Sequence, residues 1–158
     1  MEETRLITID GSTQKSGVAL FINGKYNKHV LLDFSKDKNM DSRFEEMSKS
    51  LWDNLSNNNP DVVYMEEVYS ARDPRTSKFL SRLQGVVYSW CMNNNCEFNT
   101  ITPSSWRKQL EFHQVKGVKR IQLKEQSIKY VLEHYDLKVN DDEADAICIG
   151  DAVIKKYS

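Results

Sequence analysis

The dipeptide Asn23-Gly24 is the feature that most constrains how this chain folds. Asn-Gly between two strand-like segments is the strongest local signal for a two-residue hairpin turn, and here it separates residues 17–22 from residues 26–34. Another apolar run, residues 6–10, precedes this hairpin and ends at a Gly-Ser-Thr turn sequence. The beginning of the chain is therefore predicted to form three antiparallel strands.

The rest of the chain alternates between helical and strand-like patterns. Apolar residues recur at helical spacing within 41–55 and 76–92, whereas 61–66 and 96–101 are short segments typical of strands. Three more helical segments are expected at residues 103–110, 121–135 and 141–156. Helical crossovers make the two later strands parallel to the first. We therefore predict an α/β fold with a five-stranded mixed sheet, three antiparallel strands and then two parallel ones, flanked by helices.

Length and composition exclude several classes of protein. With 158 residues, the chain is expected to be a single domain spanning residues 1–158. No run approaches the roughly 20 apolar residues of a membrane span, and the acidic N-terminus does not resemble a signal peptide. The three cysteines and three histidines lack metal-ligand spacing, which argues against a zinc site or a disulfide framework. We expect a cytoplasmic protein with no membrane partner.

Charge is unevenly distributed along the chain, although the net charge is only −1. Residues 70–82 contain four basic side chains and one acid, and residues 105–129 contain seven basic side chains and two acids. Residues 130–158 contain seven acids and three lysines instead. The two basic segments indicate a local surface for an anionic partner such as nucleic acid.

Four carboxylates stand out by their positions. Asp10 ends the first strand and Glu66 ends the fourth, and the ends of parallel strands open at one edge of a sheet. Asp142 and Asp145 are three residues apart, so they share one face of the last helix. An all-carboxylate site favours Mg²⁺ or Mn²⁺, and two such ions can hold the attacking water and the leaving oxygen of a phosphodiester. Asp10 would then bridge both ions, and Glu66 would complete one of them. Asp145, assisted by Asp142, would complete the other.

Each carboxylate also has an ordinary structural explanation. An Asp before Gly-Ser is typical of a turn, and acids at residues 141–143 are typical of a helix N-terminus. Glu66 and Glu67 are also compatible with a solvated strand end, and Glu67 is an alternative ligand in place of Glu66.

Three motifs together resemble the RuvC family of Holliday junction resolvases: Asp10-Gly-Ser-Thr-x-x-Ser-Gly, Met65-Glu66-Glu67-Val68-Tyr69 and Asp142-Glu143-Ala144-Asp145-Ala146. The resemblance implies an RNase H-like fold and a Mg²⁺-dependent homodimer that nicks four-way DNA junctions during recombination. It places the catalytic and metal-binding acids at Asp10, Glu66, Asp142 and Asp145, and Mn²⁺ is expected to replace Mg²⁺. The small size and the Lys- and Asn-rich composition favour a phage-type member that acts in the cytoplasm of a bacterial host.

The same resemblance implies which side chains contact DNA. The aromatic residue that the family uses against DNA bases corresponds to Tyr69. The lysines near the scissile phosphate correspond best to Lys108 and Lys124, and Lys124 is expected to be catalytic. The register leaves Lys116, Lys119 and Arg120 as alternatives. The expected DNA-binding residues are Tyr69, Arg72, Arg75, Lys108, Lys116, Lys119 and Arg120.

Some of these sequence features are also compatible with other functions. Asp10-Gly-Ser-Thr also resembles the first phosphate motif of actin-type ATPases, but 158 residues are too few for their two nucleotide-enclosing domains, so no nucleotide cofactor is expected. A ribonuclease H would use a similar acidic cluster, but the basic segments and the late pair of aspartates favour a junction enzyme. A broader nuclease of branched DNA and a non-catalytic junction-binding protein with a relic site are the remaining alternatives.

Two symmetric nicks across one junction require two active sites related by a two-fold axis, so we expect a homodimer. Helix 76–92 has an apolar stripe that fits an interface between two copies. The stripe consists of Phe79, Leu83, Val86, Val87 and Trp90. Packing of the same residues against the sheet is the alternative.

Overall fold

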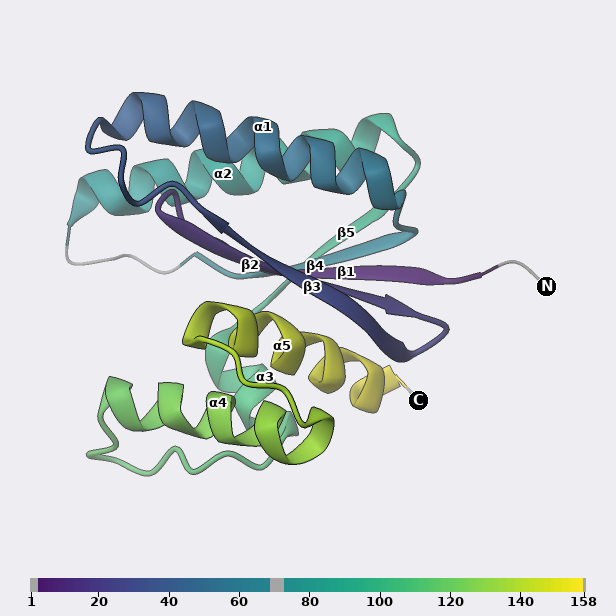
Figure 1. Ribbon diagram of the computed structural model, residues 1–158, viewed down its shortest axis with the longest axis vertical. Helices are drawn as coiled ribbons and strands as arrows, with labels where there is room; N and C mark the ends of the chain where they lie inside the picture. Colours follow the sequence, from purple (N-terminus) through teal and green to yellow (C-terminus); the bar gives the residue numbers. More distant parts are fainter. Residues whose placement is uncertain (1–2, 69–72, 158) are drawn as a thin grey trace.

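The computed structural model describes residues 3–68 and 73–157, and a five-stranded sheet runs through its centre (Figure 1). The strand order is β3-β2-β1-β4-β5. The antiparallel strands are β1 (Arg5–Asp10), β2 (Lys15–Ile22) and β3 (Lys25–Asp33), and the strands parallel to β1 are β4 (Val62–Glu66) and β5 (Glu97–Ile101). Asn23 and Gly24 form the turn between β2 and β3, both with positive φ, as a tight hairpin requires. The predicted mixed sheet is confirmed.

Helices cover both faces of the sheet (Figure 1). One face is covered by α1 (Met40–Asn58) and α2 (Pro74–Asn93), and the other by α3 (Pro103–Gln109), α4 (Arg120–Tyr135) and α5 (Asp141–Tyr157). Each layer encloses its own cluster of buried apolar side chains against the sheet. Within the described ranges, no helix has both the length and the apolar character needed to cross a membrane.

Alternation along β1 divides its side chains between the two layers. Ile7 and Ile9 are fully buried in the cluster under α1 and α2, whereas Leu6 belongs to the cluster under α5. Thr8 is also fully buried, and its hydroxyl group donates to the backbone oxygen of Ala146 at 2.6 Å. A hydrogen bond within an otherwise apolar interface therefore ties α5 to β1.

Two glycines allow α5 to lie close to the sheet. A Cβ atom on Gly17 would lie 2.1 Å from the backbone oxygen of Asp142, and one on Gly150 would lie 1.9 Å from the ring of Phe21. Gly17 is also the register partner of Asp10 across β1 and β2. The close approach at Gly17 therefore brings the first turn of α5 next to the end of β1.

The apolar stripe on α2 packs inside the chain. Its buried members are Phe79, Leu83, Val87 and Trp90. Val86 is partly exposed, and the indole Nε1 of Trp90 donates to Ser56 Oγ of α1 at 3.0 Å. The prediction that this stripe forms a dimer interface is wrong for these four buried residues, because an amphipathic helix that covers a sheet buries its apolar face in the core. For them the alternative, packing within the chain, is correct. A dimer contact through the rest of the helix stays a prediction.

We expect Gly17→Ala to destabilise the protein by about 1–3 kcal/mol, because the added methyl group meets the backbone of α5 rather than a flexible side chain. Urea unfolding measures this change. Gly85→Ala on α2 is the matched control, since nothing lies within 4 Å of its added Cβ. That control should stabilise the protein by about 0.4–1 kcal/mol, because alanine restricts the unfolded chain. Equal unfolding midpoints for Gly17→Ala and the unaltered protein would contradict the close approach.

Candidate active site

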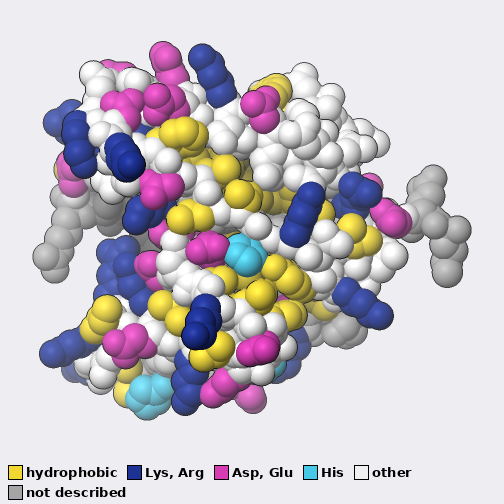
Figure 2. Space-filling view, in the orientation of Figure 1, with side chains coloured by type: hydrophobic (Ala, Val, Ile, Leu, Met, Phe, Trp, Pro, Cys, Tyr) yellow, Lys and Arg dark blue, Asp and Glu magenta, His cyan; other side chains and the backbone are white. Residues whose placement is uncertain are grey.

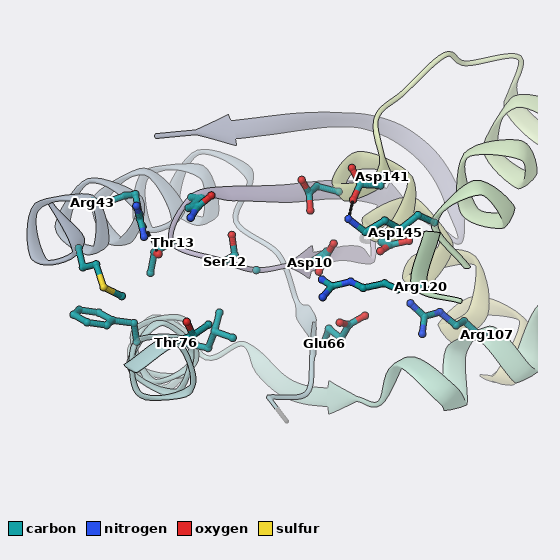
Figure 3. A pocket seen from close by; sticks show the side chains of 17 residues that line it. Asp10, Ser12, Thr13, Arg43, Glu66, Thr76, Arg107, Arg120, Asp141 and Asp145 are labelled. Atoms are coloured by element: carbon teal, nitrogen blue, oxygen red, sulfur yellow. Dashed lines mark hydrogen bonds and ion pairs between the residues drawn. The ribbon is translucent and has the colours of Figure 1, made fainter. Parts of the chain in front are cut away.

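The carboxyl ends of β1 and β4 open into a cavity of about 350 Å³ (Figure 3). Asp10 ends β1 and Glu66 ends β4, and the parallel register of these strands brings both carboxylates to one edge of the sheet. The first two turns of α5 add Asp141, Asp142 and Asp145 to the same cavity. The structure therefore brings together all four carboxylates that the sequence singled out, and adds a fifth.

Hydrogen bonds outside the cavity fix the N-terminus of α5. Asn140 and Glu143 cap each other: the Asn140 side chain accepts from the backbone N–H of Glu143 at 2.9 Å, and Glu143 Oε1 accepts from that of Asn140 at 3.2 Å. Glu143 Oε2 also lies 2.8 Å from Nε2 of His29 on β3. Helix capping thus accounts for Glu143, whereas Asp142 and Asp145 line the cavity.

Burial raises the pKa values of four of the five carboxyl groups in the cavity, whereas at Asp141 the hydrogen bond and charge of Lys124 outweigh burial and lower the pKa. Loss of water, followed by the charges of Glu66 and Asp145, raises the pKa of Asp10 well above its ordinary value. Burial raises the pKa of Asp145 to about 7, although a hydrogen bond with Ser127 opposes this shift. Burial is also the main cause of the raised pKa values of Glu66 and Asp142. The cluster consequently binds a proton, or another cation, more readily than isolated carboxylates do.

One carboxylate oxygen lacks a partner. Asp145 Oδ1 is buried, and none of the described residues donates a hydrogen bond to it. A cation would satisfy this oxygen, and an oxygen-only donor set suits a hard divalent ion. Within the described part of the chain, no three His, Cys, Asp or Glu side chains stand ready to enclose one ion.

Glu66 interacts with residues of α3 and α4 in the cavity wall. The indole Nε1 of Trp106, a fully buried residue of α3, donates to Glu66 Oε2 at 2.9 Å. This bond and the charges of Arg107 and Arg120 oppose the rise in the Glu66 pKa that burial causes. Figure 3 shows Arg120 extending toward the space between Asp10 and Glu66. Glu66 is therefore both oriented and partly neutralised by α3 and α4.

Lys124 of α4 also lines the cavity. At the left of Figure 2, basic and acidic side chains lie together between the two helical layers. Lys124 Nζ forms an ion pair with Asp141 Oδ2 at 2.8 Å. This pair holds the ammonium group at the rim of the acidic cluster, so Asp141 has a partner in the protein that the other four carboxylates do not share.

Of the basic residues expected near the scissile phosphate, the structure brings Arg120 and Lys124 to the carboxylates. Lys108 instead lines a different hollow, beside Ala152 and the last turns of α5. The reason is the rotation of α3: Arg107 lines the cavity and the buried Trp106 donates to Glu66, so the next residue points elsewhere.

The other residues expected to contact DNA either do not line the cavity or lie outside the described residues. Lys116 and Lys119 are exposed on the segment that joins α3 to α4, and Arg75 is exposed in the first turn of α2. Tyr69 and Arg72 lie outside the described residues. The DNA-binding roles of these five residues stay predictions.

Glu67 faces away from the cavity. Its Oε1 accepts from the backbone N–H of Val68 at 3.0 Å and from Gln84 Nε2 at 3.3 Å. Hydrogen bonding, led by the Thr100 side chain, lowers its pKa. The position of Glu67 therefore gives no support to the alternative in which it replaces Glu66 as a ligand.

Among the residues that line or support the cavity, Arg43, Trp106 and Arg107 carry hydrogen-bond donors that were not predicted from the sequence. Arg43 did have a detectable signal, because it occupies the same helical stripe as the buried apolar residues Met47 and Leu51 of α1. Arg107 belongs to the basic segment 105–129, but the sequence does not indicate which of its members faces the acids.

Comparison with known proteins agrees with this fold. The family model described as "Crossover junction endodeoxyribonuclease RuvC" matches residues 6–153. A curated protein of that description from Caldicellulosiruptor saccharolyticus is 21% identical over 151 residues, which cover 92% of this chain and 89% of the relative.

Solved structures share the fold. Thermus thermophilus RuvC in complex with Holliday junction substrate has a TM-score of 0.73 and 14% identity, over 98% of this chain and 94% of that chain. The yeast mitochondrial Holliday junction resolvase Ydc2 has a TM-score of 0.60 and 17% identity, over 96% of this chain and 78% of that chain. With nearly its whole length matched by the family model, this chain belongs to the RuvC family of crossover junction endodeoxyribonucleases.

Proposed function

We propose that this protein is a divalent-metal-dependent endonuclease that nicks four-way DNA junctions. The observation that carries the proposal is one cavity in which carboxylates from β1, β4 and α5 face basic side chains from α3 and α4. Carboxylates suit metal-assisted hydrolysis, and the basic side chains suit a phosphodiester. Membership in the RuvC family and the likeness to a RuvC bound to Holliday junction substrate support the same activity.

The cofactor that we propose is Mg²⁺, with Mn²⁺ as a substitute and two ions in each active site. The RuvC family in general depends on divalent metal ions. The residues that would hold the ions are Asp10, Glu66, Asp142 and Asp145. Their oxygen-only chemistry and the unpartnered Oδ1 of Asp145 fit such ions. When bound, the ions activate a water molecule and stabilise the leaving oxygen of the phosphodiester.

Protein side chains around the carboxylates orient the reacting groups. Trp106 fixes the direction of the Glu66 carboxylate through its indole N–H, a type of support that typically changes metal affinity or activity by about 10- to 100-fold. Arg120 and Lys124 are the residues that we assign to the scissile phosphate, because they line the cavity. Asp141 keeps Lys124 extended at the rim of the cluster.

The other predicted basic residues are assigned to the DNA arms that extend beyond the cavity. Each phosphate that these residues contact should add to the salt dependence of junction binding. The residues are Arg72, Arg75, Lys108, Lys116 and Lys119, and Tyr69 is assigned to base stacking.

We expect the protein to be a homodimer, because two symmetric nicks in one junction require two sites related by a two-fold axis. Sedimentation equilibrium at micromolar concentration should give twice the 18.4 kDa mass of the chain. A single species of 18.4 kDa would contradict the dimer.

The free energy of unfolding in EDTA should fall as the pH rises from about 4 to about 7. The folded protein holds the Asp145 proton up to a pKa of about 7, whereas the unfolded chain releases it near the ordinary value of 3.8, so between these values the folded state binds more protons. One such group contributes a slope of about 1.4 kcal/mol per pH unit. Asp145→Asn should therefore flatten the profile, and urea unfolding at pH 4–8 measures it.

The matched control is Asp53→Asn, which changes an exposed carboxylate of α1 and should leave the slope unchanged. At pH 8, adding Mg²⁺ should stabilise the unaltered protein and stabilise Asp145→Asn less. Parallel pH profiles for Asp145→Asn and the unaltered protein would contradict the raised pKa.

Asp10→Asn should lower junction cleavage by at least about 100-fold. Removing a residue that only supports a metal ligand costs up to about 100-fold in metal affinity or activity, and removing a ligand itself should cost more. Junction binding should persist or tighten, because the change removes a negative charge that faces phosphate. The measurement uses a labelled four-way junction and a matched linear duplex, each with Mg²⁺, Mn²⁺ or EDTA. Loss of binding together with cleavage would mean that Asp10 is structural.

The same assay on the unaltered protein separates the alternative functions. Paired nicks in the four-way junction alone support a junction resolvase. Equal nicking of other branched DNA would favour the broader branched-DNA nuclease, and junction binding without cleavage in either metal would favour the non-catalytic binding protein.

A further inference from the structure

The end of the cavity opposite Arg107 and Arg120 has a second set of hydrogen-bond donors. Arg43 extends from α1 toward Thr13, which lies in the loop between β1 and β2, and Ser12 separates this pair from Asp10 (Figure 3). Arg43 is only 8% exposed, and Thr13 only 7%. A guanidinium group is thus nearly buried at one end of the cavity, away from the arginines of α3 and α4.

The neighbours of Arg43 do not neutralise its charge by an ion pair. Its Nε donates to Thr13 Oγ1 and its Nη1 to the backbone oxygen of Asp37, both at 3.3 Å. Among the described residues, no carboxylate forms a salt bridge with it. The nearby Asp37 carboxylate is occupied instead, by Ser42 Oγ at 2.6 Å and by the backbone N–H of Asn39 at 3.0 Å. Arg43 therefore has only the charge of the nearby Asp37 to offset its burial, without a direct ion pair, and a bound anion would stabilise the guanidinium group further.

Two donor groups remain available at this end of the cavity. No described acceptor takes a hydrogen bond from the Nη2 group of Arg43, and Thr13 Oγ1 accepts from Arg43, which leaves its own O–H free to donate. The neighbouring Ser12 hydroxyl is not available in this way, because it donates to the backbone oxygen of Lys15 at 2.8 Å. A guanidinium group with an adjacent hydroxyl donor matches the chemistry of a phosphate group.

We propose that Arg43 and Thr13 bind a phosphate of the cleaved DNA strand that lies beside the scissile phosphate. The inference rests on the proposed nuclease function and adds a second anchor to it. A strand that crosses the carboxylates meets Arg120 and Lys124 at one end of the cavity and Arg43 at the other. Arg43 is accordingly a positioning residue: it sets which phosphodiester lies at the carboxylates.

The test combines a protein variant with single neutral phosphates in the DNA. Junctions that carry one methylphosphonate at each position around the cut are titrated with the unaltered protein and with Arg43→Gln in EDTA. At one position the neutral group should weaken binding of the unaltered protein by about tenfold, the size of one charge-assisted hydrogen bond. In Arg43→Gln that position should lose its effect while the other positions keep theirs, and the salt slope should fall by about 1.

Two further variants separate phosphate binding from a purely structural role. Lys49→Gln makes the same charge change at an exposed position of α1 and should leave the position profile intact. Thr13→Val keeps the shape of Thr13 and removes its donor, so it should weaken the effect at the same DNA position even if Arg43→Gln fails to fold. Arg43→Lys should restore part of the effect, because it restores the charge without the planar fork.

An unchanged position profile in Arg43→Gln and Thr13→Val, with junction binding intact, would overturn this inference alone. Equal weakening at every position together with a lower melting temperature would also overturn it, because that result indicates a structural role. Absence of junction binding by the unaltered protein would overturn the proposed function and this inference together.

Discussion

Repulsion among carboxylates that share one cavity is the constraint on which the rest of the site depends. Burial and neighbouring charges raise the pKa values of Asp10 and Asp145, so the folded chain holds these groups at an energetic cost. The surrounding elements offset that cost in different ways. Trp106 donates a hydrogen bond to Glu66, and Lys124 pairs with Asp141 at the rim. These partners offset only part of the negative charge in the cavity. The remaining negative charge favours the binding of cations, which metal-assisted hydrolysis requires.

The carboxylates stay together despite this energetic cost because α5 packs closely on the sheet. Gly17 and Gly150 remove side chains that would hold α5 away, and the hydroxyl of Thr8 fixes it to β1. The capping group of Asn140 and Glu143 then determines where the first turn begins. The contacts that stabilise the interface between α5 and the sheet therefore also determine the positions of the α5 carboxylates in the site.

The sequence predicted the parts of the structure that follow from chain direction and periodicity. Parallel pairing of β1 and β4 places Asp10 beside Glu66 whatever the side-chain packing, and spacing along α5 does the same for Asp142 and Asp145. The sequence did not predict how each helix is rotated about its axis. Arg107 rather than Lys108 faces the acids, and the apolar face of α2 serves the core rather than a partner, because helix packing decides both outcomes. Arg43 was missed although it shares the buried stripe of α1, because a charged residue there contradicts the apolar pattern.

The carboxylates come from opposite ends of the chain, and this has a consequence for synthesis on the ribosome. Asp10 and Glu66 are translated early, whereas Asp142 and Asp145 lie on α5, after all other described elements. A nascent chain that has made the whole sheet still lacks two of these four carboxylates, and even a completed chain brings them into the cavity only when α5 docks. The carboxylate cluster is therefore complete only after α5 has been made and has docked, so a chain that ends before α5 contains the sheet without the full cluster.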